Sequence, residues 1–351
     1  MSGLKILQDF KSKRDSSKIR SILAVAAGKG GVGKSSVAVN LALALKNQGF
    51  RVGLLDADIY GPSLEQMLPE GMEPVENPEN VERLLPALTF GIPFISVAHF
   101  QKEASIIRAP IANQIIEQFL SIVEWGELDY LIIDFPPGTG DIQLTLMQKA
   151  KISAAIMVTT PQVVATLDVR KAVQLFQKMK IPVLGVLENM SYLLQGKEKF
   201  FPFGCGGAEA LAKEFSFPVL GQIPIDPKIS EMGDRGESLF EKASDSPGAK
   251  AFVDALKQIL EEEKKIEKEE TTVRSGGPNH LEIEMGGKWH QISLHEIQKH
   301  CPCALCERQK KCDKEVSLLE FSPVGMYALR ITFSSGCSRG IYPFALLKKL
   351  I

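Results

Sequence analysis

Two lysines and four glycines lie within the run GKGGVGKSS (residues 28–36), and this density of glycine frees the backbone to wrap around an anion. Gly28, Gly33, Lys34 and Ser35 satisfy the pattern G-x-x-x-x-G-K-S/T. In that pattern successive backbone N–H groups point at phosphate oxygens, and the following helix directs its N-terminal dipole at the same anion. The run predicts a nucleotide site in which Lys34 bridges the β- and γ-phosphates of ATP and Ser35 holds Mg²⁺.

Carboxylates follow two apolar runs further along the chain. LIIDFPPGTGD places Asp134 at the end of one run, where it would support the metal through a water molecule. The loop at 136–138 is then positioned to sense the γ-phosphate. LLDADIYGPS offers Asp56 and Asp58 at the end of another run, the usual place for sites in open α/β sheets. We expect Asp58 to orient the attacking water; the alternative is a helix N-cap or turn residue.

The elements that must position these side chains alternate from residue 21 to about 260. Continuous apolar runs predict buried strands, and amphipathic stretches such as KSSVAVNLALALKNQG and VVATLDVRKAVQLFQKMK predict helices between them. This rhythm is typical of an α/β fold with a mainly parallel sheet and helices on both faces. The predicted strands are SILAVAA, VGLLDAD, YLIIDFP, ISAAIMVTT, VLGVLENM and VLGQIPI.

The chain of 351 residues is too long for one average domain. A charged stretch followed by Gly-Gly-Pro predicts a linker over 263–279. Beyond it, LEIEMGGKWHQI is a strand–turn–strand pattern that opens a small α+β domain over 280–351. An N-terminal extension over 1–20 and an ATPase domain over 21–262 complete the predicted organisation.

The composition argues against several other classes of protein. An apolar content of 44% and a charged content of 24% are those of an ordinary globular protein. A net charge of -1 gives no electrostatic basis for binding nucleic acid or an anionic membrane. No stretch is long and apolar enough to span a bilayer, and the N-terminal residues lack the apolar core of a signal peptide. We therefore expect a cytoplasmic protein with no nucleic-acid and no membrane partner.

The six cysteines are unevenly distributed, with Cys205 alone and the other five near the C-terminus. HCPCALC places Cys301, Cys303 and Cys306 on one tight turn, and in a reducing compartment such clustering predicts metal ligands rather than disulfides. A tetrahedral site needs a fourth ligand. The neighbours His300 and Cys312 are spare candidates, although the charge of His300 also suits the end of a helix.

The run KGGVGKS resembles the deviant Walker A signature of the group that contains MinD, Mrp and the nitrogenase iron protein. The resemblance implies that its first lysine, Lys29, reaches across a homodimer interface to the partner's nucleotide, like an arginine finger supplied in trans. A solvated loop lysine is the alternative. The implied protein is a two-fold dimer whose assembly depends on its ATP state.

DADIYGPS, IIDFPPGTGD and LENMS, in this order, resemble the Mrp/ApbC iron–sulfur cluster carrier ATPases. By this resemblance Asn189 recognises adenine, which suits a carboxamide that both donates and accepts hydrogen bonds. Taken without the resemblance, the residue would equally suit a turn. The predicted catalytic residues are Lys29, Lys34 and Asp58, and the predicted Mg²⁺ ligands are Ser35 and Asp134. The predicted nucleotide contacts are Gly28, Lys29, Gly30, Gly31, Val32, Gly33, Lys34, Ser35, Ser36 and Asn189.

The chain departs from the carriers after LENMS. The carriers place a Cys-Pro-x-Cys pair there to bridge a cluster across the dimer, whereas this chain continues YLLQGKEKFFPFGCGG, with Gln195 to Glu198 in the expected place. Cys205 would give two thiolates per dimer, short of the four that a cluster usually takes. A loop or buried thiol is the other interpretation of Cys205. This variant resembles the chloroplast high-chlorophyll-fluorescence scaffold branch, which has a similar segment and a similar C-terminal domain.

The C-terminal segment resembles the small zinc-binding domain at the N-terminus of γ-butyrobetaine hydroxylase. That family places a histidine in its later hairpin as fourth ligand, and here Cys337 stands in that place. The resemblance implies a site of four thiolates, which suits Zn²⁺ and also an iron–sulfur cluster. The predicted ligands are Cys301, Cys303, Cys306 and Cys337.

These observations favour an ATP-hydrolysing homodimer that assembles iron–sulfur clusters or transfers them to recipient apoproteins. One alternative is a MinD/ParA-like positioning ATPase, which would need a membrane helix or a DNA-binding face. The terminal FALLKKLI is short for a membrane helix. Another alternative is a zinc-stabilised, ATP-gated adaptor that carries no cluster, which the missing cysteine pair supports.

Overall fold

The computed structural model describes most of the chain, and its residues divide into two compact units. One unit comprises Asp15–Glu261, and the other combines Met1–Arg14 with Glu262–Ile351. Each has a hydrophobic core of its own. The described residues are 4–6, 18–59, 61–69, 73–100, 119–138, 140–269, 271–285, 288–303, 306, 316–324, 328–337 and 340–351.

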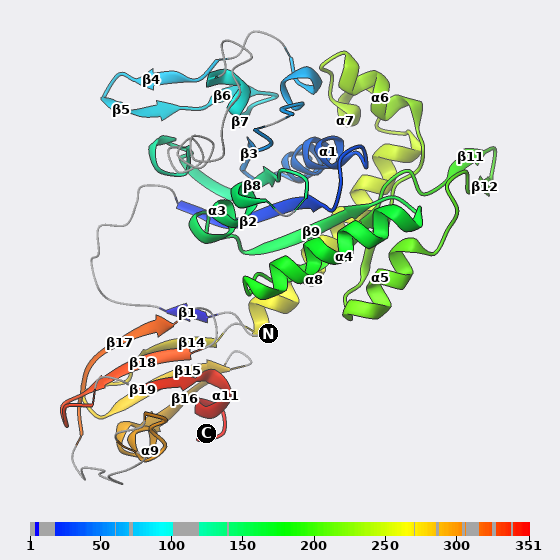
Figure 1. The fold of residues 1–351 in the computed structure, drawn as a ribbon. Helices are drawn as coiled ribbons and strands as arrows, with labels where there is room; N and C mark the ends of the chain where they lie inside the picture. Colours follow the sequence, from blue (N-terminus) through cyan, green and yellow to red (C-terminus); the bar gives the residue numbers. More distant parts are fainter. Residues whose placement is uncertain are drawn as a thin grey trace. The chain divides into compact units, whose positions relative to one another are not determined.

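The larger unit is built on an eight-stranded sheet with the strand order β13-β10-β9-β2-β8-β3-β7-β6 (Figure 1). Every neighbouring pair is parallel except β6 with β7. The mainly parallel sheet predicted from the apolar runs is therefore confirmed. The strands are β2 (Lys18–Ala27), β3 (Val52–Asp56), β6 (Ala87–Thr89), β7 (Ile92–Ser96), β8 (Glu127–Asp134), β9 (Ala154–Thr159), β10 (Val183–Glu188) and β13 (Val219–Gln222).

Helices cover both faces of this sheet, as Figure 1 shows for α4 and α8, which lie on opposite sides of it. Because neither face meets water, β3 and β9 are buried at every position and have no polar alternation in their sequences. One apolar core joins the sheet to α3, α4 and α5. The helices are α1 (Lys34–Asn47), α3 (Asp141–Lys149), α4 (Val163–Lys178), α5 (Gly207–Phe215), α6 (Pro227–Asp234), α7 (Leu239–Lys242) and α8 (Pro247–Glu269).

The parallel register brings the predicted carboxylates together at one edge of the sheet. Asp56, the last residue of β3, is the register partner of Asp134, the last residue of β8. On the other side of β8, Asp134 is paired with Val25 near the end of β2, which leads into the loop at 28–33. The loop and both carboxylates therefore share the carboxyl edge, where sites in open α/β sheets form.

Short elements connect this framework. Two of them form exposed hairpins, one from β4 and β5 and the other from β11 and β12. They are β4 (Val75–Asn77), β5 (Asn80–Leu85), η1 (Glu65–Met67), η2 (Val97–Phe100), β11 (Leu193–Gln195) and β12 (Glu198–Phe200).

The smaller unit contains a four-stranded sheet of order β1-β14-β15-β16 and a three-stranded sheet of order β17-β18-β19. The predicted strand–turn–strand is confirmed, because β15 and β16 pair antiparallel with Met285 opposite Lys288. A single apolar core joins both sheets, and Cys301 lies in it. The elements are β1 (Leu4–Ile6), β14 (Thr271–Ser275), β15 (His280–Met285), β16 (Lys288–Ser293), α9 (Leu294–Lys299), β17 (Leu318–Val324), β18 (Ala328–Phe333), β19 (Gly340–Pro343) and α11 (Phe344–Leu347).

Two segments differ from the sequence-based expectation. The segment 263–279, expected as a linker, contains the end of α8 and the whole of β14. The N-terminal extension contributes β1, which pairs in parallel with β14 at the edge of the four-stranded sheet. The charged end of α8 has the composition of a linker because charged side chains suit an exposed helix face as well as a flexible chain. That the chain divides at residues 262 and 280 into parts that fold independently remains a proposal.

Candidate functional site

The loop at 28–33 joins β2 to α1 and takes a conformation that requires glycine. Gly31 and Gly33 have φ angles of 81° and 79°, in the left-handed region that side chains disfavour. Gly28 packs on α4 so closely that a Cβ there would stand 2.1 Å from the carbonyl carbon of Asp168. The sequence therefore builds a tight loop held against a helix, with its N–H groups free to turn toward an anion.

Helix α1 begins at Lys34 and presents an uncompensated positive end at the loop. Its N-cap is Gly33, which offers no side-chain acceptor, and its first turn contains no acidic residue. The first N–H groups of a helix lack intrahelical partners and favour anions. Lys34 itself is buried, and Ser35 follows it at the same end. The structure therefore places all the predicted phosphate-contacting positions, from 28 to 36, around one helix terminus.

Asp134 binds both predicted phosphate-site side chains. Lys34 Nζ lies 2.6 Å from Asp134 Oδ1, and Ser35 Oγ donates to Asp134 Oδ2 over 2.6 Å. Asp134 is fully buried, and burial raises the pKa of its carboxyl group while the charge of Lys34 opposes that change. Lys34, Ser35 and Asp134, predicted separately from two motifs, form one hydrogen-bonded set.

The two aspartates after β3 have different surroundings. Asp58 Oδ2 lies 3.7 Å from Lys34 Nζ, so Asp58 is beside the phosphate site as the sequence suggested. Burial raises the pKa of Asp58, and Lys34 opposes the effect. Asp56 is more deeply buried: burial, followed by the charge of Asp134, raises its pKa to about 7. The structure thus brings three carboxylates around one lysine.

Asp56 organises the loop that bears Asp58. Its Oδ1 accepts the N–H of Asp58 at 3.1 Å, and its Oδ2 accepts the N–H of Leu64 at 3.3 Å. Oδ2 also accepts the hydroxyl of Ser96, the last residue of β7, at 3.2 Å. The sequence named Asp56 as a strand-end carboxylate but gave no sign of this role, because Ser96 joins it only through the pairing of β3 with β7.

Asn189 lies against the phosphate loop at the end of β10. Its Nδ2 donates to the carbonyl oxygen of Val32 over 2.9 Å, and a Cβ on Gly33 would stand 2.2 Å from that nitrogen. A cavity of about 350 Å³ opens beside these residues. Its walls are mainly apolar, with few polar groups, which suits a planar base. The wall includes Gly33, Ser36, Val39, Asn40, Leu43, Met67, Asn189, Met190, Ile225 and Asp226.

Lys29 lies in the same loop and differs from Lys34 in its surroundings. The side chain is half-buried, and within the described part of the chain it has no ion pair or hydrogen bond. Lys34, in contrast, is buried and paired with Asp134. Within the described part of the chain the two lysines of the motif therefore differ, because Lys34 is paired with a carboxylate and Lys29 is not.

Glu188 is a buried carboxylate that motif reasoning missed. It immediately precedes Asn189, and its oxygens accept the hydroxyl of Ser191 at 2.7 Å and the N–H of Ala208 at 2.9 Å. Ala208 is in the first turn of α5, so Glu188 joins the end of β10 to the start of that helix. The only sequence signal was an acidic residue at the end of an apolar run.

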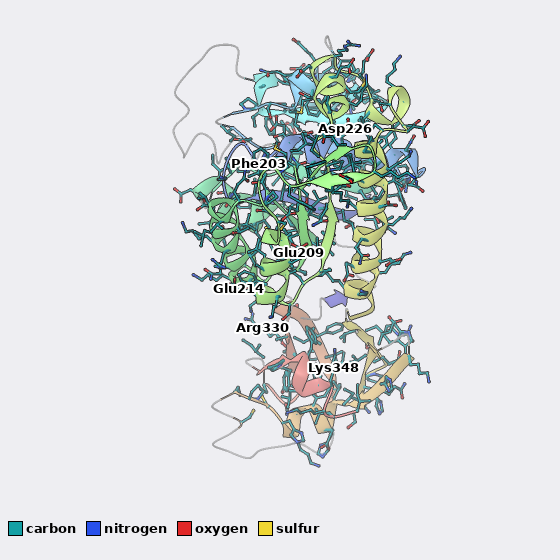
Figure 2. All side chains as sticks on the ribbon, turned by 90° about the vertical axis from the view of Figure 1, so that its right-hand side faces the viewer. Phe203, Glu209, Glu214, Asp226, Arg330 and Lys348 are labelled. Atoms are coloured by element: carbon teal, nitrogen blue, oxygen red, sulfur yellow. The ribbon has the colours of Figure 1, made fainter. Side chains whose placement is uncertain are left out.

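The segment between Asn189 and α5 contains the β11–β12 hairpin and then Cys205. Cys205 is exposed, and Gly204 and Gly206 on either side of it both have positive φ angles. Figure 2 shows Phe203 beyond the N-terminal end of α5, along which Glu209 and Glu214 follow. Cys205 is the one described cysteine of the larger unit, and the other described cysteines belong to the smaller unit.

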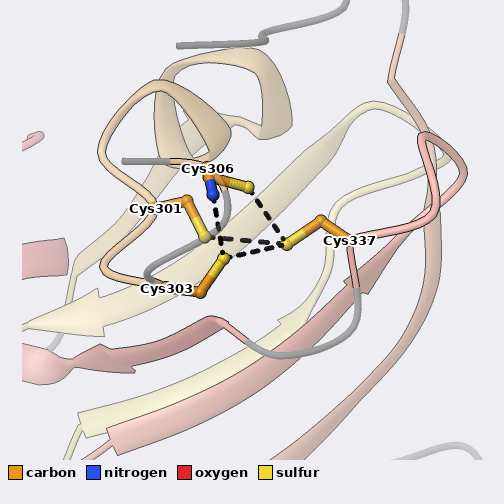
Figure 3. A group of neighbouring side chains, drawn as sticks. All are labelled: Cys301, Cys303, Cys306 and Cys337. Carbon is orange, nitrogen blue, oxygen red and sulfur yellow. Dashed lines mark hydrogen bonds between the residues drawn. The ribbon is translucent and has the colours of Figure 1, made fainter. Parts of the chain in front are cut away.

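The four predicted metal ligands converge in the smaller unit (Figure 3). Their sulfur atoms all lie within 4.8 Å of one another. Cys337 Sγ is 3.7 Å from that of Cys301, 3.9 Å from that of Cys303 and 3.5 Å from that of Cys306. A tetrahedral zinc site with bonds of about 2.3 Å has sulfur–sulfur edges of about 3.8 Å. The four thiols therefore have the spacing of ligands to a single ion.

The other candidates do not enter this group. His300 is partly exposed, and its Nδ1 lies 3.0 Å from the carbonyl oxygen of Glu296 in the preceding turn of α9. Cys312 lies outside the described residues. Among the described histidine, cysteine and carboxylate side chains, the four cysteines form the one group with metal-ligand spacing.

The local hydrogen bonds make one thiol acidic. The N–H of Cys306 donates to Cys303 Sγ over 3.4 Å, and this bond, together with the neighbouring thiols, lowers the pKa of Cys303 to about 7. Burial instead raises the pKa of Cys301. The thiolate is the form that binds metals. Bringing four thiols this close is favourable once a cation compensates their charge, so the donor set fits a metal ion.

The fold and the first of these sites define a P-loop nucleotide-binding protein with a second lysine in its phosphate loop. A family model described as ParA, NUBPL iron-transfer P-loop NTPase, matches residues 18–260, and the chain belongs to this family. Residues 274–348 match a second model, the N-terminal domain of γ-butyrobetaine hydroxylase-like proteins. The protein is thus a P-loop ATPase with a C-terminal domain of the hydroxylase-like type, as the sequence predicted.

Relatives with curated names resemble either the ATPase part or nearly the whole chain. The iron–sulfur cluster carrier protein of Aquifex aeolicus is 43% identical over 251 residues, which cover 69% of each chain. The chloroplastic Fe–S cluster assembly factor HCF101 of Oryza sativa is 38% identical over 349 residues, 95% of this chain. This chain spans 65% of the length of that plant relative.

Solved structures share the ATPase fold. A nucleotide-binding protein from Archaeoglobus fulgidus, in complex with ADP, is 39% identical with a TM-score of 0.55, covering 63% of this chain and 88% of that one. An ATP complex of McdA from Cyanothece, 17% identical with a TM-score of 0.50, covers 70% and 97% and shows the likeness of fold alone. None of the described helices has the length and apolarity to cross a bilayer.

Proposed function

We propose that this ATPase works as a homodimer that assembles iron–sulfur clusters or delivers them to recipient apoproteins, with ATP turnover controlling the exchange. The observation that supports this most strongly is the likeness to the plant assembly factor over 95% of the chain, because it includes both the ATPase part and the four-cysteine domain. The carrier from Aquifex aeolicus supports the same activity through the ATPase part.

ATP would occupy the loop and the neighbouring cavity. Asn189 and the apolar wall hold the base, the N–H groups of the loop bind the phosphates, and Lys34 bridges the β- and γ-phosphates. Ser35 and Asp134 would hold Mg²⁺, which would supply charge neutralisation at the phosphates. Asp58, beside Lys34, orients the attacking water.

Lys29 acts on the nucleotide of the other protomer. The charge of Lys34 is already countered by Asp134 within the protomer, whereas Lys29 has no such partner among the described residues. A cation that arrives only when two chains associate stabilises the transferring phosphoryl group and makes hydrolysis depend on dimer formation. ATP and dimerisation then stabilise each other by mass action.

Zinc is the ion that we assign to Cys301, Cys303, Cys306 and Cys337. In a 4Fe–4S cluster each thiolate binds a different iron, so the sulfur atoms stand further apart than around one ion. Here all four lie within 4.8 Å, which suits a single tetrahedral Zn²⁺. The ion would hold α9, β18 and the following turn together in a unit too small to build a large core.

The transported cluster is then cargo that binds elsewhere. Cys205 is the exposed thiol of the described ATPase unit, and a homodimer presents two copies of it. A cluster takes four ligands, so further thiolates would come from the recipient or from a small thiol. The rival function, a zinc-stabilised and ATP-gated adaptor without cargo, is favoured by the same shortage of thiols.

Anaerobic reconstitution with iron and sulfide, followed by metal analysis and visible spectra, distinguishes these functions. The cluster-handling function predicts an iron–sulfur chromophore that the Cys205→Ser variant loses while it keeps one zinc per chain. Cys301→Ser should lose the zinc and keep the chromophore. A colourless protein that binds zinc and hydrolyses ATP would support the adaptor function instead.

A further inference from the structure

Tyr342 on β19 carries a buried hydroxyl that has no hydrogen-bond partner among the described residues. Its side chain is fully buried, in the same apolar core of the smaller unit that contains Cys301. A buried hydroxyl without a partner is unfavourable, and phenylalanine would fill the same space without that cost. The hydroxyl of Tyr342 therefore requires an explanation beyond packing.

The ring of Tyr342 is held in place by the strands around it. It packs edge-on against Phe333 of β18, with ring centroids 6.0 Å apart and planes at 78°. Tyr342 is also the register partner of Leu329, so β18 fixes the backbone on either side of it. Cys337 lies between β18 and β19, which means that one hairpin supplies both this metal ligand and Tyr342. The strand pairing thus determines where the hydroxyl points.

The phenol ring borders the sulfur atom of Cys301. Gly340 lies two residues before Tyr342 on the same strand, and a Cβ added there would stand 2.9 Å from Cys301 Sγ. The same Cβ would stand 3.0 Å from Cζ of Tyr342, the carbon that bears the hydroxyl. Burial raises the pKa of the Tyr342 hydroxyl, and the adjacent thiol of Cys301 raises it further. The hydroxyl is therefore on the side of the ring that faces the metal ligands.

Among the four ligands, Cys301 has the greatest need of such a donor. Cys301 is buried, whereas Cys303, Cys306 and Cys337 are partly exposed. Four thiolates outweigh the charge of one divalent ion, so the occupied site is negative and hydrogen-bond donors around its sulfur atoms stabilise it. Water reaches Cys301 least, so its donor has to come from the protein.

We propose that the hydroxyl of Tyr342 donates a hydrogen bond to the thiolate of Cys301 when the four cysteines hold their metal ion. The proposal rests on the metal site of the proposed function and adds a positioning residue that is not itself a ligand. The bond orients the sulfur atom, offsets part of its charge and gives the buried hydroxyl its partner. A phenol keeps its proton at neutral pH, so Tyr342 is a donor here and not a fifth ligand.

The substitution Tyr342→Phe changes metal affinity in a direction that depends on this bond. It keeps the ring and its contact with Phe333 and removes only the oxygen atom. Metal binding and folding are coupled in a unit of this size, so a group that destabilises the folded unit also weakens metal binding. Removal of an unpartnered hydroxyl would leave zinc affinity equal or higher. Removal of a donor to the thiolate would lower it.

Competition between the full chain and a zinc chelator of known affinity measures this change. We expect the zinc dissociation constant of Tyr342→Phe to be about 10- to 100-fold higher than that of the wild type, the usual cost of losing a partner of a metal ligand. The control is Tyr192→Phe, which removes another largely buried phenol hydroxyl, in the larger unit, and should leave the constant unchanged. An equal or lower constant for Tyr342→Phe would overturn the proposal.

Substitution of Co²⁺ for zinc gives a second readout that reports on the sulfur atoms themselves. Thiolate-bound Co²⁺ absorbs by charge transfer from sulfur to metal, and a hydrogen bond that stabilises the sulfur lone pairs raises the energy of this transition. Tyr342→Phe should therefore shift the charge-transfer band to longer wavelength, and Tyr192→Phe should not. Weaker zinc binding with an unshifted band would refute the hydrogen bond and assign the loss to packing.

The outcomes separate this proposal from the metal site on which it rests. If the wild type binds zinc and Tyr342→Phe binds it equally well, the hydrogen bond is refuted and the four-cysteine site stands. A wild type that binds neither Zn²⁺ nor Co²⁺ would refute both. Weaker zinc binding together with the band shift, in Tyr342→Phe and not in Tyr192→Phe, is the result that the proposal predicts.

Discussion

Lys34 and Asp134 form a buried ion pair, with Nζ 2.6 Å from Oδ1, at the carboxyl edge of the central sheet. The second carboxylate oxygen of Asp134 accepts the hydroxyl of Ser35, so one side chain engages both residues that the motif assigns to phosphate and Mg²⁺. We expect a bound nucleotide to compete with Asp134 for both groups. The register of β3 and β8 places Asp56 opposite Asp134, so Asp56 adjoins the group formed by Lys34, Ser35 and Asp134.

Substitution of Lys34 tests the phosphate site. Lys34→Ala should reduce ATP hydrolysis by about 100-fold or more and weaken nucleotide binding, because the γ-phosphate loses its principal counter-charge. Phosphate release and nucleotide titration measure the two effects. Lys257→Ala, on the exposed side of α8, is the control and should behave as wild type. Near-normal hydrolysis without Lys34 would place the nucleotide elsewhere.

The buried carboxyl group of Asp56 makes the free energy of unfolding depend on pH. Its pKa is raised from 3.8 to about 7, mainly by burial, so the folded protein holds a proton that the unfolded chain releases. This contribution favours the folded state below about pH 4 and is lost as the pH rises to about 7. Asp56→Asn removes the titration. We expect the wild type to lose stability relative to Asp56→Asn between pH 4 and 7, measured by denaturant unfolding; a constant difference would contradict this.

Gly33→Ala separates backbone strain from damage to the base site. Its φ of 79° costs any other residue about 1–2 kcal/mol, and its Cβ would displace Asn189. Gly49 has a similar φ of 87° and open space around it, which makes Gly49→Ala the matched control. Gly33→Ala should lose at least as much stability as Gly49→Ala, but only Gly33→Ala should lose nucleotide affinity, at least tenfold. Equal nucleotide affinities would remove Asn189 from the site.

The sequence predicted the parts of the structure that local chemistry determines. The runs around Val25, Leu55 and Ile132 read as strands because they are apolar without interruption, and burial on both faces explains that pattern. The phosphate loop was recognisable because its glycines are required by positive φ angles and close packing. The three cysteines of HCPCALC could be predicted as metal ligands because they lie close together in the sequence.

Long-range pairing accounts for what the sequence did not reveal. The strand β1 pairs with β14, so Leu4 meets Thr271 across most of the chain, and neither segment has a distinctive pattern. The role of Asp56 depends on Ser96, which only the β3–β7 pairing brings near. Glu188 binds Ala208 from the next helix. Such contacts follow from tertiary structure, for which a single sequence gives no local signal.

Metal removal tests the four-cysteine site. A chelator strong enough to extract zinc should unfold the smaller unit, because metal-binding energy is folding energy in a unit of this size. Trp289, whose ring stacks under Arg274 at 3.9 Å, reports this as a change in fluorescence. Serine at any of the four ligand positions should have the same effect, and Cys205→Ser should not. An unchanged signal in metal-free protein would exclude a structural metal.

The most direct measurement of the proposed function is cluster delivery. Reconstituted protein is mixed anaerobically with an apoprotein that gains enzymatic activity when it receives a 4Fe–4S cluster, with ATP or without it, and activation is followed over time. We expect ATP to change the rate of activation in the wild type and to have no effect in Lys29→Ala, which keeps its nucleotide affinity. No activation by wild-type protein, despite intact ATPase activity and bound zinc, would contradict the assignment and leave an ATP-gated adaptor.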